Sequence, residues 1–189
     1  MRDDLINYLI TDPKYYSSDK EEFKKRLTKS LNSKKVDIAC FRDKTSKNFK
    51  ELASIFVKTC KEFNIKKILI NEDFKLAKEL NASGVHLTSQ QFNKIQEVKN
   101  LDLHIIISCH NHKEIEEARN AKVNAVTFSP IFTTPNKGIP KGITKLEECI
   151  RVYKDLDIIA LGGIISEEHI NQISTINAYG FASIRYFVI

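Results

Sequence analysis

The sequence predicts a minimal (β/α)8 barrel, a TIM barrel with its last helix short or absent, formed by a single domain over residues 1–189. Short apolar runs alternate with amphipathic segments along the whole chain. Several runs are nearly continuous in Ile, Val, Leu and Ala, which is typical of strands buried on both faces of a parallel sheet. Eight such runs fit a barrel, although the chains of such barrels are usually at least about 200 residues long.

The predicted strands and helices follow one another in order. The strands are expected at 5–11, 36–42, 67–71, 84–87, 104–108, 124–128, 158–162 and 180–184, and helices at 50–63, 114–120, 146–153 and 167–176. In the first helix Leu52, Ile55, Phe56 and Cys60 form one apolar stripe at steps of three and four. The hydroxyls at Ser166 and at Thr45 and Ser46 are expected to start helices by capping free amides.

The end of the chain departs from the usual barrel. After the eighth predicted strand only residues 185–189 remain, which is too short for a closing helix. We therefore expect a less covered seam. Either a partner subunit such as a second copy covers it in a homo-oligomer, or the chain is truncated relative to its relatives.

Composition and charge exclude several classes of protein. The chain has 30 basic and 24 acidic residues, a net charge of +6, with both signs mixed along its length. This mixture indicates solvated helix faces and argues against a nucleic-acid partner. No apolar run is long enough to span a membrane, and no signal peptide follows Met1, so we expect a cytoplasmic protein. The four cysteines are far apart and are expected to be buried small hydrophobes.

Polar residues follow the predicted strands at the ends where barrel enzymes place their chemistry. Arg42, Lys44 and Lys137 would bring three cations to one mouth, and such cations bind phosphate oxygens. Gly162 and Gly163 would let the backbone approach an anion. The pattern predicts a site for a small phosphorylated or pyrophosphorylated compound. Each residue also has a structural reading, such as a surface ion pair or a turn, and His86 and His110 can be satisfied histidines beside buried strands.

Six motifs in a fixed order carry a family resemblance: YLITDP at 8–13, FRDK at 41–44, INE at 70–72, GVHL at 84–87, SPIFTTPNK at 129–137 and ALGGI at 160–164. The chain resembles the thiamine phosphate synthase/TenI superfamily over nearly its whole length. The resemblance implies a small barrel that joins thiazole phosphate to hydroxymethylpyrimidine pyrophosphate with Mg²⁺, releasing pyrophosphate. TenI members instead aromatise the thiazole or have other roles.

The resemblance also implies roles for individual residues. Pyrophosphate would be held, and its departure catalysed, by Arg42, Lys44 and Lys137, with Asn71 beside them. Ser108 would lie beside the pyrimidine, and Glu72 would replace an aspartate that binds magnesium. The thiazole phosphate side would be formed by Thr134, Asn136, Gly163, Ser183 and Ile184.

Four positions depart from the family pattern. A neutral Gln91 stands where synthases have a second magnesium-binding aspartate, and an amide is a weaker Mg²⁺ ligand than a carboxylate. Cys40 replaces a glutamine that faces the pyrimidine, and Arg185 replaces a small residue near the thiazole phosphate. The histidine expected of a TenI aromatase two residues after the strand-six Phe is absent, because Pro130 stands there.

These patterns leave three hypotheses. The first is a transferase of the thiamine phosphate synthase type, favoured by the intact cations. The second is a TenI-like protein that binds thiazole phosphate or thiamin phosphate, or a thiazole tautomerase, without pyrophosphate transfer. The third is a subunit without enzymatic activity that binds a ligand or a partner. Dependence on Mg²⁺ separates the first from the second, and a stable complex covering the seam would favour the third.

Overall fold

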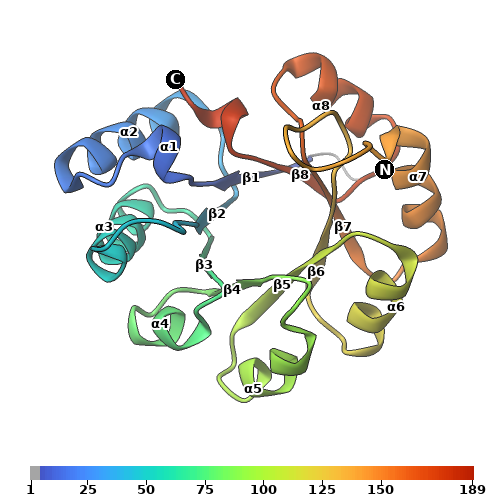
Figure 1. Ribbon diagram of the computed structural model, residues 1–189, viewed down its shortest axis with the longest axis horizontal. Helices are drawn as coiled ribbons and strands as arrows, with labels where there is room; N and C mark the ends of the chain where they lie inside the picture. The colour runs from blue at the N-terminus through green and yellow to red at the C-terminus, as the bar shows by residue number, and fades with distance from the viewer. Residues whose placement is uncertain (1–4) are drawn as a thin grey trace.

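Eight parallel strands close into a barrel in the computed structural model, which describes residues 5–189. Each strand pairs with the next along the chain, and β8 pairs with β1 (Figure 1). The strands are β1 Ile6–Ile10, β2 Ile38–Phe41, β3 Lys67–Asn71, β4 Gly84–Leu87, β5 His104–Cys109, β6 Ala125–Phe128, β7 Asp157–Leu161 and β8 Gly180–Ser183. The predicted barrel and all eight strands are confirmed, and no strand boundary differs by more than two residues.

Helices surround the strands on the outside of the barrel (Figure 1). They are α1 Pro13–Tyr16, α2 Lys20–Ser33, α3 Phe49–Glu62, α4 Phe74–Glu79, α5 Ile95–Lys99, α6 His112–Asn120, α7 Gly142–Val152 and α8 Glu167–Ser174, with 3-10 turns η1 Phe92–Lys94 and η2 Arg185–Phe187. The four predicted helices correspond to α3, α6, α7 and α8. Ser166 caps α8 as predicted, because its side chain accepts a hydrogen bond from the amide of His169.

The start of α3 differs from the prediction. Thr45 and Ser46 do not cap the helix, which begins at Phe49 after the N-cap residue Asn48. Instead, Asp43 Oδ1 accepts hydrogen bonds from the amides of Thr45 and Ser46, each at 2.9 Å. The carboxylate ties both amides into a turn before the helix, as Asp side chains often do in loops.

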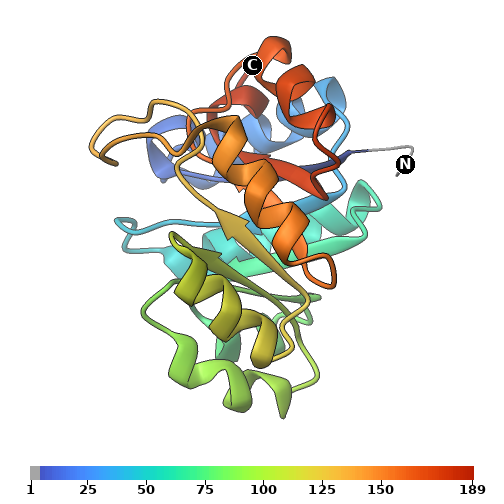
Figure 2. The same cartoon turned by 90° about the vertical axis from the view of Figure 1, so that its right-hand side faces the viewer.

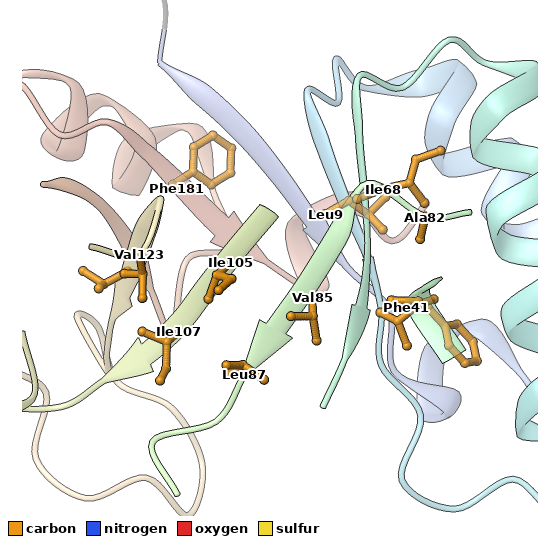
Figure 3. Close-up of a cluster of buried hydrophobic side chains, with 14 of the residues drawn as sticks. Leu9, Phe41, Ile68, Ala82, Val85, Leu87, Ile105, Ile107, Val123 and Phe181 are labelled. Carbon is orange, nitrogen blue, oxygen red and sulfur yellow. The ribbon is translucent and has the colours of Figure 1, made fainter. Parts of the chain in front are cut away.

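Two apolar layers hold the barrel together. Inward-facing residues of the strands fill its interior: Tyr8, Ile10, Ile38, Cys40, Leu69, Ile106, Ala125, Ile159 and Ala182. Outward-facing residues pack against the helices, and Figure 3 shows Val85 and Leu87 of β4 beside Ile105 and Ile107 of β5 in this layer. Burial on both faces explains why the strands read as nearly continuous apolar runs.

The seam after β8 is filled by η2. Phe187 is fully buried, and its ring stacks on that of Phe181 with centroids 6.0 Å apart. The Tyr186 hydroxyl donates to Glu167 at 2.6 Å, and the Lys34 ammonium lies over the Tyr186 ring and 3.3 Å from Glu167. Within residues 5–189 only this 3-10 turn follows β8, as predicted, and its buried Phe187 packs against the strand that we expected to be less covered.

Hydropathy and cysteine burial in the structure follow from the composition of the chain. No helix within residues 5–189 is long and apolar enough to cross a membrane. Cys40, Cys60, Cys109 and Cys149 are free and buried, as predicted.

Candidate functional site

The loops that follow the strands gather at one end of the barrel. Figure 2 shows the loop between β6 and α7 extending farthest from the barrel on this side. Ile38 and Cys40 of β2 face the interior, so the alternation of a strand directs Arg42 into the mouth. Phe41 pairs with Ile70, which places Arg42 beside Asn71 at the end of β3. Two of the predicted residues are thus brought together by register.

Arg42 is held by the end of β1. Its guanidinium donates to the Asp12 carboxylate, and both side chains are about one quarter exposed. Thr11 fixes the backbone below, because its hydroxyl accepts from the amide of Arg42 and donates to the carbonyl of Arg42. The contact of Asp12 with Arg42 was not predicted, although Asp12 lies inside the YLITDP motif and follows the first strand.

Lys44 and Asn71 both contact Glu72. The Lys44 ammonium lies 3.3 Å from Glu72 Oε1, and the Asn71 amide donates to the same oxygen at 3.0 Å. Both members of the ion pair are about half exposed, so the pair itself contributes little to stability. The cations Arg42 and Lys44 each have a carboxylate partner here, and an incoming anion would compete with those carboxylates.

Gln91 contacts the backbone of Glu72. Its amide oxygen accepts hydrogen bonds from the amide and the hydroxyl of Thr88, and its amide nitrogen donates to the Glu72 carbonyl at 3.3 Å. The side chain therefore links the loops after β3 and β4. Glu72 itself has a positive φ of 66°, a conformation that is uncommon for residues other than glycine.

The residues at this place fit a Mg²⁺ ion only in part. Mg²⁺ is usually held by one or two carboxylates together with substrate phosphates and water. Glu72 supplies one carboxylate, while the Gln91 oxygen is already engaged by Thr88. No group of three or more His, Cys, Asp or Glu side chains that could hold a metal occurs within residues 5–189. An ion here would depend largely on phosphate oxygens.

Ser108 belongs to a polar network inside the barrel. The His86 ring is buried and bonds Tyr8 through Nδ1 at 2.8 Å and Ser108 through Nε2 at 3.0 Å. Burial, together with the nearby charge of Arg42, lowers the pKa of His86 to about 4. His86 is therefore neutral at pH 7, and the reading of a satisfied buried histidine is confirmed.

Cys40 lies below the mouth. Its side chain is fully buried in the barrel interior, and burial raises the pKa of its thiol to about 12. The family pattern has the longer glutamine at this position. The shorter Cys40 is inaccessible from the mouth and remains protonated at neutral pH.

The loop between β6 and α7 carries three predicted residues. Thr134 is partly buried and its hydroxyl donates to the Phe132 carbonyl at 3.0 Å, whereas Asn136 and Lys137 are exposed. Within the described chain, the Lys137 ammonium makes no hydrogen bond or ion pair with another side chain. Arg42, Lys44 and Asn71 are brought together at the strand ends, and no hydrogen bond or ion pair joins Lys137 to them.

Gly163 is required by the packing of that same loop. Its φ is 74°, and a Cβ atom there would lie 2.6 Å from the carbonyl carbon and oxygen of Phe132. The Phe132 ring is also stacked on His169 at the start of α8, with centroids 4.1 Å apart. The close approach of the Phe132 backbone therefore requires glycine at position 163, whether or not a ligand binds there.

Ser183 is the last residue of β8, Ile184 follows it, and Ser183 contacts the residue after Gly163. The Ser183 hydroxyl donates to the Ile164 carbonyl at 2.6 Å and accepts from the amide of Tyr186. The amides of Gly163 and Ile184 have no acceptor among residues 5–189, so both remain able to bind an anion. Arg185 is exposed at the start of η2.

Two open cavities, with volumes of about 310 and 530 Å³, lie away from the predicted site residues. Both are lined by Ile150, Lys154 and Asn177, and so lie against α7 and the segment before β8. None of the predicted site residues lines either one.

Comparison with known proteins shows the family to which the chain belongs. The family model described as "Thiamine monophosphate synthase" matches residues 7–187. Thiamine-phosphate synthase 1 of Streptococcus pneumoniae strain R6 is 30% identical over 139 residues, which are 71% of this chain and 65% of that protein. The match thus covers less than two thirds of that relative. A putative thiamine-phosphate synthase 2 of Aquifex aeolicus is 33% identical over 187 residues, 96% of each chain.

A solved structure shares the fold. The thiamine phosphate pyrophosphorylase of Pyrococcus furiosus superposes with a TM-score of 0.81 and 19% identity, covering 95% of this chain and 85% of that one. At this identity the likeness concerns the fold alone.

Proposed function

The chain belongs to the thiamine monophosphate synthase family, and from this membership we propose that it is a transferase that joins hydroxymethylpyrimidine pyrophosphate to thiazole phosphate. The observation that carries the proposal is the cluster of Arg42, Lys44 and Asn71 at neighbouring strand ends. This cluster lies at the end of the barrel where such folds place their active sites.

The reaction needs charge stabilisation more than proton transfer. The bond between the pyrimidine methylene and pyrophosphate breaks, and its electron pair leaves with pyrophosphate. The lone pair of the thiazole nitrogen then forms the new bond to that methylene carbon. Arg42 and Lys44 would stabilise the negative charge where it develops, with Asn71 donating a further hydrogen bond. Arg42 and Lys44 would exchange their contacts with the carboxylates of Asp12 and Glu72 for contacts with the pyrophosphate oxygens.

The remaining predicted residues fit the second substrate. The free amides of Gly163 and Ile184 would bind the phosphate of the thiazole, beside Ser183. Thr134 and Asn136 lie on the loop that extends from this side of the barrel (Figure 2). Lys137 would reach the pyrophosphate when this loop moves toward the mouth, because its ammonium has no competing partner in the described part of the chain.

A Mg²⁺ ion would bind through Glu72 and the oxygens of pyrophosphate. It would add positive charge to the leaving group as a Lewis acid. Since Gln91 contributes no charge, we expect Mg²⁺ to bind weakly without pyrophosphate and to arrive with it.

A second function is favoured by one observation. Gln91 is neutral, and its oxygen is engaged by Thr88, so half of the expected carboxylate pair is missing. A TenI-like protein that binds thiazole phosphate or thiamin phosphate, or a thiazole tautomerase, would not need that pair.

The test is formation of thiamin phosphate from thiazole phosphate, hydroxymethylpyrimidine pyrophosphate and Mg²⁺, detected by the fluorescence of the oxidised product. We expect product from the wild type and a loss of at least a hundredfold in kcat for Lys137→Ala. Lys66→Ala, an exposed lysine just before β3 at the opposite end of the barrel, is the matched control. No product together with measurable binding of thiazole phosphate would favour the TenI-like function.

A further inference from the structure

A chain of polar side chains crosses the interior of the barrel below the mouth. Tyr8, His86 and Thr127 come from β1, β4 and β6, and all three are buried. The Tyr8 hydroxyl lies 2.8 Å from His86 Nδ1, and His86 Nε2 lies 3.0 Å from Ser108 Oγ. The proposed reaction gives Tyr8, His86 and Thr127 no role. Only Ser108 is open enough to reach a ligand.

The direction of these hydrogen bonds decides what Ser108 offers. His86 is neutral, so one ring nitrogen carries a proton and the other accepts. Burial raises the pKa of the Tyr8 phenol well above its usual value, which keeps its proton in place. That proton can go to the imidazole nitrogen or to the nearby sulfur of Cys40. Imidazole nitrogen is much the stronger acceptor, and a thiol sulfur is a weak one.

The phenol therefore donates to Nδ1, and the imidazole proton resides on Nε2. This N–H donates to Ser108 Oγ at 3.0 Å and also lies near Thr127 Oγ1, which is 3.4 Å from Nε2. The Thr127 hydroxyl donates to the same Ser108 oxygen at 3.5 Å. Both donors to Ser108 Oγ thus come from the barrel interior. With these two donors in place, the Ser108 hydroxyl donates to no further group among residues 5–189, so its proton is free to turn into the mouth.

We propose that Tyr8 and His86 are positioning residues that fix Ser108 as a hydrogen-bond donor, so that the substrate atom bound there is an acceptor. This inference rests on the proposed function, in which the acceptor is either a ring nitrogen of the pyrimidine or an oxygen of the pyrophosphate. The opposite tautomer of His86 would turn the Ser108 proton inward and present a lone pair to the mouth. Such a site would select a donor, such as an amino group on the ring.

The first experiment needs neither activity nor a variant. ¹⁵N NMR of the full-length protein at pH 7, with His86 assigned through backbone connectivity, reports which ring nitrogen carries the proton. We expect the proton on Nε2. A proton on Nδ1 overturns the proposal, whether or not the protein makes thiamin phosphate.

The second experiment measures binding by calorimetry, with hydroxymethylpyrimidine alone and inorganic pyrophosphate alone as probes. We expect Ser108→Ala to weaken binding of one of the two probes by about tenfold. Tyr8→Phe should weaken binding of the same probe by at least threefold. The probe that is affected contains the acceptor atom. Steady-state kinetics should show Tyr8→Phe raising KM for the pyrimidine substrate more than it changes kcat.

Tyr16→Phe is the matched control for Tyr8→Phe. Tyr16 is also buried, and its hydroxyl bonds Ser30 at 3.2 Å outside the barrel interior. We expect this variant to leave the His86 tautomer and both affinities unchanged. Equal weakening by the two Tyr→Phe variants, or no effect of Ser108→Ala on either probe, would overturn the proposal. A different outcome is a wild-type protein that makes no thiamin phosphate, although its His86 carries the Nε2 proton and Ser108→Ala weakens binding of one probe. This outcome would reject only the proposed reaction.

Discussion

The guanidinium of Arg42 donates to the carboxylate of Asp12, with Nη1 and Oδ2 2.5 Å apart. This bond joins the ends of β1 and β2 and places a negative charge beside a predicted pyrophosphate ligand. Asp12 also accepts from the amide of Lys14 at the start of α1. It therefore aligns Arg42 in the free protein and competes with the anion that Arg42 is proposed to bind.

Asp12→Asn is expected to strengthen binding of pyrophosphate about fivefold, because it removes a negative charge close to the anion and preserves the oxygen that bonds Lys14. Calorimetric titration with inorganic pyrophosphate measures the change. Asp102→Asn, before β5 at the other end of the barrel, is the control and should leave the affinity unaltered. Weaker binding in Asp12→Asn would mean that alignment of Arg42 matters more than the local charge.

Gln91→Asp is expected to raise the affinity for Mg²⁺ about tenfold in the presence of pyrophosphate, because a second carboxylate then stands beside Glu72. Gln91→Asn is the matched control, since it has the same length as Asp without the charge. Both variants lose the bond from Gln91 to the Glu72 carbonyl. The Mg²⁺ dependence of pyrophosphate binding measures the effect, and identical titrations of the two variants would show that residue 91 does not face the ion.

The pH dependence of stability follows from His86. Burial lowers the pKa of His86 in the folded protein to about 4, whereas the unfolded chain has the ordinary value of 6.5. Below pH 6.5 the unfolded chain binds a proton that the folded chain binds only near pH 4. The free energy of unfolding therefore falls as the pH is lowered through this window, by roughly 2 kcal/mol between pH 7 and pH 5 from this group.

Urea unfolding of the wild type and of His86→Gln at pH 7 and pH 5 tests this expectation. The variant should be less stable at pH 7 but should lose about 2 kcal/mol less between the two pH values. His104 also has a pKa lowered to about 4 by burial and by the charge of Lys67, so its contribution remains in both proteins. Equal losses in the two proteins would contradict the prediction.

Phe187→Ala is expected to destabilise the fold by about 3 kcal/mol, because it empties the space that η2 fills beside β8. Phe187 is fully buried against Phe181, and the neighbouring Val188 is 37% exposed. Val188→Ala should therefore cost less than about half a kcal/mol. Urea unfolding at pH 7 compares the two variants, and similar losses would show that η2 does not close the seam.

Much of the fold follows from local pattern. Continuous apolar runs locate the eight strands, because a strand buried on both faces has few polar residues. The position of Arg42 and Asn71 at the carboxyl ends of predicted strands indicates that both lie at the mouth, because parallel strands end at the same rim. The prediction that Thr45 and Ser46 start a helix was wrong, because the amides of both residues donate to Asp43 instead. The residue types of Thr45 and Ser46 alone do not reveal this contact.

The sequence by itself determined the barrel, the family and the residues that can reach the mouth, because each of these depends on residue type and spacing along the chain. Only the tertiary structure decided the partners: Asp12 with Arg42, Gln91 with the Glu72 carbonyl, and Phe187 with Phe181. It likewise decided that Tyr8, His86 and Ser108 form one hydrogen-bonded chain. These pairs join different strands and loops, so their contacts depend on the register and closure of the barrel, which no local pattern encodes.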